Sequence, residues 1–574
     1  MSFDVMLQQA QDCYMNGAYQ EAERQCRALL AFVPENSDVL NLLGLIAADK
    51  GDHGTAVLYF EDALKQAQNK LPIYFNLAVS LSEDCKSDEA IRAYQQVLAL
   101  APNTKEALNN LGALYEKKGD MVQAQDCYQK AVLIDENYVD ALVNMAVLKS
   151  DISALQSLAA RFEKSALPLY YLALSAFKEK AFDKALSYAL KADFLEQAYD
   201  IKRLIAKAYG ASGDKENAVK YNHQALLLNS KSVEALVDLG VLEQNEDYFK
   251  QALSLDVQNY AAHLTYADFL YASGRMIEAV EEYHKAVLLN AEDAALSNNV
   301  GLILKDLGDE KQALDLMMNA FIKEPDNIDI SINMAETLVL LYQKDKDEAL
   351  RIARLWALNA EDNVFATRVL AAFEQKPTTD DDIYAKILFD EFADVYESRM
   401  QSIRYAVFDK IKELGLSLGG HVLDLGCGTG LAATYLKTSQ GLWTGIDLSA
   451  KMLEKAAAKK LYDTLIESDA AAYLKQNSQK FDDILCLDVA EYLKDIEELI
   501  KLCYPARLIL SFEKAPDDVK TYRLSPMGRY QHNPDFVADI FEKAGYKKVD
   551  RHALVLRQEN GADVDGFLFI GSDA

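Results

Sequence analysis

The chain is poor in cysteine and histidine, and neither residue type is spaced for a metal site. Seven cysteines are scattered over 574 residues, none forms a C-x-x-C pair, and their odd count argues against a disulfide framework. The seven histidines show no pair with the spacing of metal ligands. We therefore expect no metal centre and a reducing, cytoplasmic environment.

The chain also lacks segments typical of membrane proteins and of nucleic-acid-binding proteins. No run of about twenty apolar residues occurs, so no membrane span is expected. No basic segment followed by an apolar one indicates a secretion signal. Acidic residues outnumber basic ones by 89 to 60, which gives a net charge of −29. A phosphate backbone requires a basic face, so we expect no unaided binding to DNA, RNA or anionic membranes.

A repeat is present instead, and it covers the first two-thirds of the chain. An alanine recurs every 34 residues, at Ala22, Ala56, Ala90 and Ala124 and again at Ala279 and Ala313. Glycines recur where two helices must approach closely, as at Gly44 and Gly112, and at the turns between helices, as at Gly51 and Gly119. A helical period of 34 is typical of tetratricopeptide repeats. The pattern predicts an all-α superhelical solenoid over residues 1–375, with about ten or eleven repeats.

Two of these repeats depart from the pattern, near residues 150 and 245, where the turn glycine is missing or the repeat is short. Irregular units of this kind can bend the superhelix or divide it into two arrays. Because each repeat packs only on its neighbours, we expect a curved solenoid with a concave groove. Such a groove usually holds a protein or peptide partner.

Asparagines recur at the same repeat position, which suggests how a peptide could bind. They are Asn76, Asn110, Asn144, Asn299 and Asn333. The pattern is similar to the asparagine ladder of O-linked N-acetylglucosamine transferase, which binds peptide backbones along a repeat groove. An amide donates and accepts hydrogen bonds, so such a ladder would hold an extended peptide without reading its sequence. The alternative is that each asparagine only bonds a neighbouring helix.

The most informative stretch lies further on, after a Pro- and acid-rich linker over residues 376–382. Val422 to Leu425 reads as a buried strand, the glycines Gly426, Gly428 and Gly430 force a tight turn, and Leu431 to Leu436 opens a helix. A second strand ends in Asp447, which is placed to bind the ribose hydroxyls of a nucleoside. Strand, turn, helix, strand and acid together predict a nucleoside-cofactor site.

The glycine spacing separates two cofactors. A dinucleotide fold requires G-x-G-x-x-G, whereas here the third glycine comes one residue early and Asp424 precedes the turn. A carboxylate there suits a cationic ligand better than a diphosphate. S-adenosylmethionine carries a sulfonium and an ammonium group and no phosphate. A nicotinamide oxidoreductase remains as the rival interpretation.

At these residues the chain resembles the class I S-adenosylmethionine-dependent methyltransferases, and its two halves together resemble bacterial methyltransferases that carry tetratricopeptide repeats. The resemblance implies a Rossmann-like α/β domain over residues 383–574, with a seven-stranded sheet whose last strand is antiparallel. It also implies that a leading helix, Leu388 to Glu397, closes over the cofactor through Tyr396 and that Asp469 bonds the adenine amino group. The predicted cofactor-binding residues are Tyr396, Asp424, Gly426, Cys427, Gly428, Gly430, Asp447, Leu448, Asp469 and Ala470.

The sequence indicates the residues that would contact the methyl acceptor less clearly than those that would bind the cofactor. Asp488-Val489-Ala490-Glu491 follows the fourth strand, in place of the Asn/Asp-Pro-Pro-aromatic motif of enzymes that methylate bases. Asp488, Glu491 and His532 are candidate proton acceptors, and Arg529 and Tyr530, in a polar and aromatic loop at 522–532, are candidate substrate contacts. The catalytic residue, if any, stays unassigned.

The sequence therefore predicts a cytoplasmic methyltransferase that uses S-adenosylmethionine and whose repeat groove recruits the acceptor, such as a protein or peptide. Two alternatives stay open. One is a small-molecule methyltransferase. The other is an interaction scaffold whose second half binds the cofactor weakly or as a sensor. The sequence indicates no metal site, and it does not predict the oligomeric state.

Overall fold

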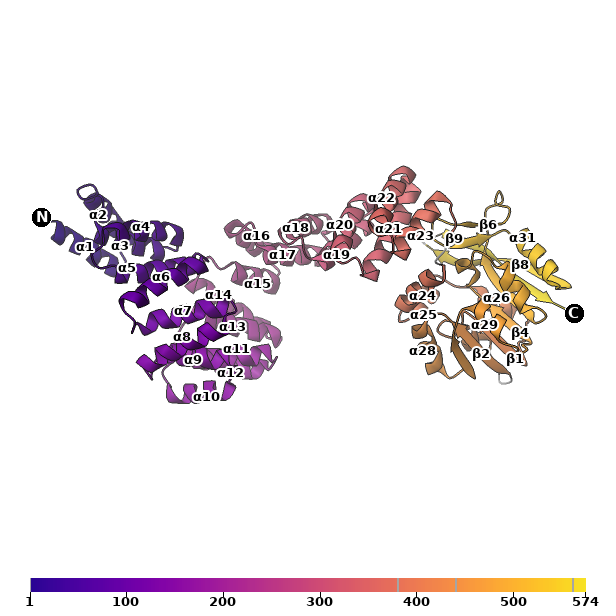
Figure 1. The fold of residues 1–574 in the computed structure, drawn as a ribbon, viewed down its shortest axis with the longest axis horizontal. Coiled ribbons are helices and arrows are strands. Elements are labelled where there is room, and N and C mark those ends of the chain that lie inside the picture. Colours follow the sequence, from indigo (N-terminus) through magenta and orange to yellow (C-terminus); the bar gives the residue numbers. More distant parts are fainter. Residues whose placement is uncertain (1, 379–380, 439–440, 560–561, 574) are drawn as a thin grey trace. The chain divides into compact units, whose positions relative to one another are not determined.

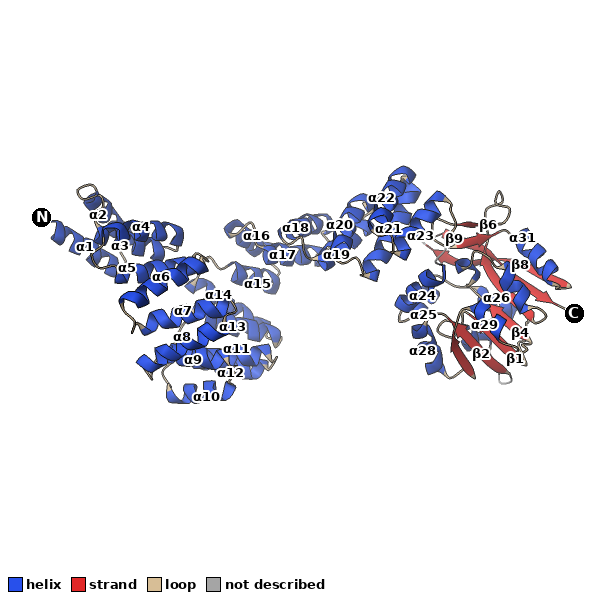
Figure 2. Cartoon of the chain, viewed as in Figure 1, coloured by secondary structure: helices blue, strands red, loops and turns tan. Residues whose placement is uncertain are grey.

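The structure is a computed structural model that describes residues 2–378, 381–438, 441–559 and 562–573. The chain divides into two compact units, Met1–Phe269 and Leu270–Ala574 (Figure 1). Helices make up the first unit and continue into the second, which also holds the strands (Figure 2). None of the helices in the described ranges is long and apolar enough to cross a membrane.

The first unit is built from antiparallel helical hairpins, as the 34-residue period predicts. Its helices are α1 (Phe3–Met15), α2 (Tyr19–Leu30), α3 (Ser37–Asp49), α4 (His53–Gln66), α5 (Leu71–Glu83), α6 (Ser87–Leu100), α7 (Lys105–Lys117), α8 (Met121–Ile134), α9 (Val139–Leu148), α10 (Ile152–Arg161), α11 (Leu167–Lys178), α12 (Phe182–Leu195), α13 (Tyr199–Ala211), α14 (Lys215–Leu228), α15 (Val233–Glu243) and α16 (Glu246–Leu255). Helix α17 (Tyr260–Ala272) spans the boundary between the units.

The two kinds of repeat glycine have different causes. Gly51 and Gly119 take φ of +80° and +81° at the turn between helices, a conformation that glycine adopts without strain. Gly44 lies inside a helix, and a Cβ there would lie 2.4 Å from Phe60 of the next helix. Gly112 meets Tyr128 in the same way, at 2.6 Å. Close helix approach therefore requires glycine at these positions.

The irregular repeats are visible as short helices. Helices α9 and α10 have 10 residues each and α15 and α16 have 11 and 10, against 12 to 14 in most of the other repeat helices. Ser150 and Gln244 take the left-handed turn conformation, with φ of +52° and +55°, where several regular repeats have glycine. Cys85 and Lys180 take the same conformation in repeats of normal length, so the missing glycine alone does not shorten a repeat.

The second unit continues the repeat and adds the sheet. Its helices are α18 (Met276–Leu289), α19 (Ala294–Asp306), α20 (Glu310–Lys323), α21 (Ile328–Lys344), α22 (Lys346–Asn359), α23 (Val364–Glu374), α24 (Asp381–Phe392), α25 (Tyr396–Ser402), α26 (Val407–Glu413), α27 (Leu431–Leu436), α28 (Ala450–Lys459), α29 (Ala470–Gln476), α30 (Glu497–Cys503) and α31 (Pro534–Ala544), with the 3-10 helix η1 (Ala490–Tyr492).

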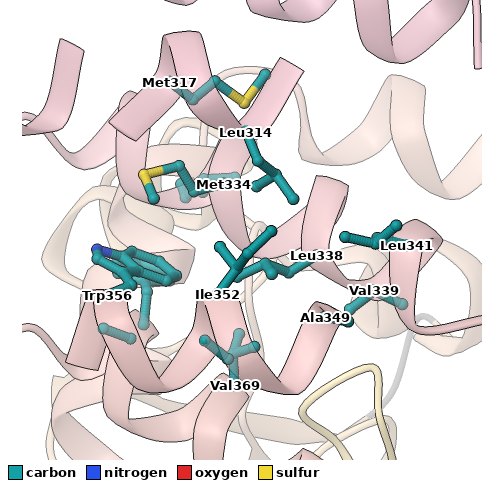
Figure 3. Packing of buried hydrophobic residues seen from close by; sticks show 14 of the residues in the cluster. Leu314, Met317, Met334, Leu338, Val339, Leu341, Ala349, Ile352, Trp356 and Val369 are labelled. Carbon is teal, nitrogen blue, oxygen red and sulfur yellow. The ribbon is translucent and has the colours of Figure 1, made fainter. Parts of the chain in front are cut away.

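One hydrophobic core joins the last repeats to the sheet domain. Met317, Met334 and Trp356 of the repeat helices are fully buried and pack together (Figure 3). The same cluster includes Leu524 and Tyr530, from the region beyond the fifth strand. The compact units consequently divide at residue 269 and not at the predicted linker, 376–382.

The strands form a seven-stranded sheet in the order β3-β2-β1-β4-β5-β9-β8. Strands β1 to β5 are parallel, and β9 runs antiparallel to both β5 and β8, so the predicted antiparallel last strand is confirmed. The strands are β1 (His421–Leu425), β2 (Leu442–Asp447), β3 (Thr464–Glu467), β4 (Asp483–Cys486), β5 (Arg507–Glu513), β8 (Lys548–Glu559) and β9 (Ala562–Ser572).

Two local predictions were wrong. The stretch 522–532, predicted as a loop, forms the hairpin β6 (Tyr522–Leu524) and β7 (Tyr530–His532), because Tyr530 and Leu524 are buried in the shared core. The predicted leading helix is two helices, α24 and α25, separated at residues 393–395. Helix α24 begins at Asp381, inside the predicted linker, and residues 379–380 of that linker lie outside the described residues.

Candidate functional site

The glycine turn after β1 is shaped by three left-handed residues. Gly426, Gly428 and Gly430 take φ of +68°, +53° and +83°. The amides of Gly426 and Cys427 both donate to the carbonyl oxygen of Ile446, at 2.8 and 2.9 Å. A Cβ on Gly426 would lie 2.3 Å from Val489, so the turn is packed on the segment after β4. Hydrogen bonds to β2 and contact with that segment therefore hold the turn in place.

Asp447 faces this turn from the end of β2. One carboxylate oxygen accepts from the Gly428 amide at 2.8 Å, and the other accepts from the Ser449 amide at 2.9 Å. Burial raises the pKa of this carboxyl, and the two backbone donors oppose the shift. Each oxygen keeps a second lone pair, so the carboxylate can accept two hydroxyl groups from a ligand.

A pocket opens between the turn and helix α24. Its wall includes Asp447, Asp469 and Asp382, and no lysine, arginine or histidine lines it among the described residues. Asp382 approaches Asp469, and burial together with that charge raises the pKa of Asp382. With Asp488, which also lines the pocket, a cationic nucleoside would find four carboxyl groups in the described wall, whereas a diphosphate would find no cation there.

Seven of the ten predicted cofactor residues line this pocket. They are Tyr396, Gly426, Gly428, Asp447, Leu448, Asp469 and Ala470. The side chain of Asp469 also caps helix α29 by accepting from the Ala472 amide at 2.7 Å, which leaves its second oxygen available.

Asp424, Cys427 and Gly430 do not line the pocket. Asp424 is 2% exposed and accepts a hydrogen bond from the Tyr462 hydroxyl at 2.6 Å. Burial raises the pKa of Asp424 to about 7, against the effect of that hydrogen bond. Tyr462 bonds Asp424, and a Cβ on Gly430 would lie 3.0 Å from the Tyr462 ring, so Tyr462 packs against the turn.

Helices α24 and α25 close over the pocket. A Cβ on Gly428 would lie 3.7 Å from the Tyr396 ring, and Asp390 accepts from the Ser449 hydroxyl at 2.6 Å. Exposed ion pairs link the same segment to the sheet domain, between Glu397 and Lys459 and between Lys386 and Glu467. The cavity beneath this lid measures about 80 Å³ and is partly open. A ligand pocket typically measures roughly 300–1,000 Å³, so the space as it stands is small for a nucleoside.

A second cavity of about 690 Å³ adjoins the first. Phe389, Tyr396, Asp488 and Tyr492 line both cavities, so these four residues separate them. The opposite wall comes from the repeat. Helix α21 contributes Ile332, Ala335, Glu336 and Val339, and helix α23 contributes Phe365, Arg368 and Val369. These positions recur at helical spacing, so one face of each repeat helix forms the wall.

Asp488 lies at the junction, while the other two candidate bases do not. Asp488 takes φ of +60°, its amide donates to the Ser511 hydroxyl at 2.8 Å, and its carboxylate accepts from Arg557 at 2.8 Å. Neither Glu491 nor His532 lines either cavity. Glu491 is fully buried without a hydrogen-bond partner among the described groups, and burial raises its pKa well above the usual range.

His532 is also fully buried, with its Nε2 donating to the Ala490 carbonyl oxygen at 3.0 Å. Burial lowers its pKa from an ordinary 6.5 to about 4, so the ring is neutral at pH 7. The structure therefore places His532 against η1, outside the described linings of both cavities.

The predicted substrate residues of the sheet domain have internal partners. Arg529 lines the second cavity and pairs with Glu513 at 2.6 Å and with Glu559. Tyr530 is buried in the shared core, and its hydroxyl contacts Thr378 at 2.9 Å. Tyr530 therefore joins the linker to the sheet domain and does not face either cavity.

Most of the predicted asparagine array bonds neighbouring helices. The amide of Asn76 donates to Asn41 at 3.2 Å, that of Asn144 to Asn109 at 2.9 Å, and that of Asn333 to Asn298 at 3.3 Å. Asn110 donates to the Tyr94 hydroxyl at 3.0 Å. For Asn299 no such bond is described. Each of these amides links one repeat to the next or two helices of a hairpin.

Sequence reasoning missed the residues that reach the site from distant segments. Asp382 was assigned to the linker, and Phe389 and Tyr492 were not singled out. The sequence signal that could have identified them is the pair of aromatic residues, Phe389 on the leading helix and Tyr492 after β4. No local pattern indicated that α21 and α23 would face the sheet domain.

A repeat solenoid followed by this sheet, turn and acid defines a tetratricopeptide-repeat protein with a class I methyltransferase domain. Comparison with known families agrees. A methyltransferase-domain family matches residues 422–506, and tetratricopeptide-repeat families match residues 7–70, 86–119 and 106–138.

Individual relatives match one half or the other. A TPR repeat-containing protein of Methanocaldococcus jannaschii is 26% identical over 353 residues, 55% of this chain and 57% of that protein. A ubiquinone biosynthesis O-methyltransferase of Coxiella burnetii is 32% identical over 88 residues, 15% of this chain and 38% of that protein. A tetratricopeptide repeat protein from Parabacteroides merdae matches at a TM-score of 0.38 and 19% identity, over 42% of this chain and 98% of that structure.

Proposed function

We propose that this protein transfers a methyl group from S-adenosylmethionine to an acceptor that the repeat helices recruit. The observation that carries the proposal is the pairing of two adjoining cavities. One is lined by the glycine turn and carboxylates, and the other is walled by repeat helices α21 and α23. The four shared residues stand where donor and acceptor would meet.

The residues of the first cavity fit the chemistry of the donor. Asp447 would accept the ribose hydroxyls, and Asp469, at the rim, would accept the adenine amino group. The acidic wall favours a sulfonium and an ammonium group over a diphosphate, which is the ligand of the rival nicotinamide interpretation. S-adenosylmethionine, when bound, supplies a methyl group on a cationic sulfur that leaves readily.

The chain's own residues would mainly orient the reactants and exclude water. Tyr396 and Phe389, on the lid, would cover the reacting centre, which raises the effective concentration of the acceptor and removes solvent. Asp488, held by Arg557 and Ser511, is a positioning residue at the junction. The repeat face on α21 and α23 would present the acceptor.

One observation favours a second candidate function. The cofactor cavity measures about 80 Å³, which is small for a nucleoside. Such a small cavity suits a scaffold whose second unit responds to the cofactor as a sensor.

Isothermal titration with S-adenosylmethionine, followed by incubation with the methyl-labelled donor and a cell lysate, tests the proposal. We expect saturable binding and transfer of label. Binding without transfer would favour the sensor. No heat at saturating donor, or heat only with the reduced nicotinamide cofactor, would contradict the proposal.

A further inference from the structure

The second cavity concentrates positive charge in an acidic protein. Among the residues that the structure describes, six basic side chains line it against four acidic ones, whereas the whole chain has 60 basic and 89 acidic residues. Such a local reversal of sign, inside a partly enclosed space, attracts an anion and repels a cation. The lining also includes aromatic and aliphatic side chains, so a bound anion would be partly desolvated.

Three of the six cations are already neutralised by the protein. Arg557 pairs with Asp488, Glu513 and Glu559, and Arg529 pairs with Glu513 and Glu559. Arg368 pairs with Asp381 at 2.7 Å and donates to the Gly528 carbonyl oxygen at 2.7 Å. These groups hold the wall in place and are not available to a ligand.

Of the other three basic side chains, Lys305 and Arg399 share one carboxylate, that of Glu336. Glu336 lies 3.4 Å from Lys305 and 3.9 Å from Arg399, and its side chain is 43% exposed. Both distances exceed those of a direct charge-assisted hydrogen bond, about 2.7–2.9 Å. The Arg404 side chain has no ion-pair partner among the described residues. Asp306 also lines the cavity, so Lys305, Arg399 and Arg404 face two carboxylates and leave a surplus of one positive charge.

Of these three cations, Arg399 lies closest in sequence to Tyr396, which lines both cavities. It follows Tyr396 by three residues on α25, so both side chains share a face of that helix, and both line the second cavity. The guanidinium lies over the Phe392 ring, 4.7 Å from its centre, which keeps it in place. An anion on Arg399 would sit beside the ring that covers Gly428.

The side chains that could accept a proton from the substrate narrow the chemical class of the methyl acceptor further. An alcohol, a phenol or an ammonium group must lose a proton at or before transfer. Neither histidine nor cysteine lines the described walls of the two cavities. Three of the four described carboxylates in the second cavity are paired with cations: Asp488 and Glu559 with Arg557, and Glu336 with Lys305. A carboxylate is already ionised at neutral pH and requires no base.

We propose that the second cavity holds a carboxylate acceptor on Arg399, and that the protein converts it to a methyl ester. A carboxylate oxygen donates a lone pair to the methyl carbon and forms the new oxygen–carbon bond. The carbon–sulfur bond breaks, and its electron pair stays on sulfur as a neutral thioether. No proton moves, and an anion and a cation become two neutral products, a change that a low-dielectric cavity favours.

This inference rests on the proposed methyl transfer. Treatment of the labelled products with mild alkali distinguishes a methyl ester from other methylated products, and so tests this inference separately. Methyl-labelled S-adenosylmethionine and a cell lysate are incubated with the full-length protein, with heat-treated protein as the blank. The labelled products are then exposed to mild alkali. We expect the label to be released as volatile methanol, because alkali hydrolyses esters but not methyl ethers or methylamines. Label in the acid-precipitated fraction indicates a protein carboxylate, and label in the soluble fraction indicates a small carboxylic acid.

Variants test the role of Arg399 directly. We expect Arg399→Gln to lower the initial rate of transfer at limiting lysate by about tenfold, the effect of losing one charge-assisted hydrogen bond. Its affinity for the donor should stay within about twofold, and Arg399→Lys should recover part of the rate. Arg351→Gln, an exposed arginine on α22 paired with Glu348, is the matched control.

Alkali-stable label, or an Arg399→Gln variant that transfers at the rate of the control, contradicts this inference while the proposed methyl transfer stands. Failure to bind donor, or the absence of any transferred label, contradicts the proposed function and this inference with it.

Discussion

At the scale of single residues, the site depends on a few buried polar groups whose partners are fixed. Asp447 is bound by two backbone amides, Asp424 by Tyr462, and Asp488 by Arg557. These contacts orient each carboxylate before any ligand arrives, and an oriented group loses less entropy when it binds. Burial also raises the pKa values of Asp424 and Asp447, so the protonation of these two carboxyl groups differs between the folded and the unfolded chain.

Asp447 provides the first test. We expect Asp447→Ala to weaken binding of S-adenosylmethionine by at least about tenfold, because it removes charge-assisted hydrogen bonds to the ribose. Asp447→Asn keeps an acceptor for the Gly428 amide and should lie in between. Titration calorimetry measures both, with the exposed Asp539→Ala on α31 as control. A folded Asp447→Ala protein with unchanged affinity would contradict the assignment.

His532 provides a pH test. Its folded pKa of about 4 lies below the ordinary 6.5, so the unfolded chain binds a proton more readily. The stabilising effect of the neutral ring is complete above pH 6.5 and is lost as the pH falls toward 4. Between pH 8 and pH 5.5 the second unit of the wild type should lose on the order of 1 kcal/mol more of its free energy of unfolding than the same unit of His532→Gln.

Urea unfolding followed by tryptophan fluorescence measures this difference, because both tryptophans, Trp356 and Trp443, lie in the second unit. NMR titration of the imidazole is an independent check that does not require the variant to fold. A ring that titrates near pH 6.5 in the folded protein would show that the burial argument is wrong.

At the scale of elements, the lid of α24 and α25 decides access to the cofactor cavity. Its exposed ion pairs with the sheet domain contribute little, since such pairs are typically worth about 0–1 kcal/mol. The half-buried bond from Ser449 to Asp390 and the packing of Phe389 on Tyr492 hold the lid more firmly. Opening of the lid must break these contacts.

We therefore expect Asp390→Ala to accelerate both association and dissociation of S-adenosylmethionine, by about tenfold in the dissociation rate. The matched variant Asp394→Ala, which removes an exposed carboxylate paired with Lys455, should change the rates by less than about threefold. Stopped-flow mixing measures both rates. Equal rates in the wild type and in Asp390→Ala would mean that this bond does not restrain the lid.

At the scale of the whole molecule, the last repeats and the sheet domain fold as one unit. Leu524 and Tyr530 share a core with Trp356 and Met334, and Arg368 of α23 bonds the Gly528 carbonyl oxygen. The repeat helices therefore do two things. They stabilise the sheet domain, and they form the far wall of the proposed acceptor cavity.

Fragments test this organisation. A fragment of residues 275–574, cut at the turn after α17, should unfold cooperatively and bind S-adenosylmethionine like the full chain. A fragment of residues 383–574 exposes Leu524 and Tyr530 and should be less stable by several kcal/mol, or aggregate. Residues 1–274 should fold alone and bind no cofactor. Circular dichroism, urea unfolding and calorimetry check each expectation. Equal stability of the 275–574 and 383–574 fragments would contradict the shared core.

The sequence by itself determined the elements whose signals are local. The 34-residue alanine period predicts helical hairpins, because each repeat places small residues where helices cross. The run Val422 to Leu425, the three glycines and Asp447 predict the turn at the end of β1, because backbone conformation there depends on neighbouring residues alone.

Only the tertiary structure decided which residues meet. Tyr530 reads as a loop residue in sequence, yet it packs in the core of the repeat, about 150 positions from its partner Thr378. Arg529 appeared free for a substrate until Glu513 and Glu559 were found beside it. Contacts of this kind depend on how packed elements orient one another, and periodicity carries no information about partners so distant along the chain.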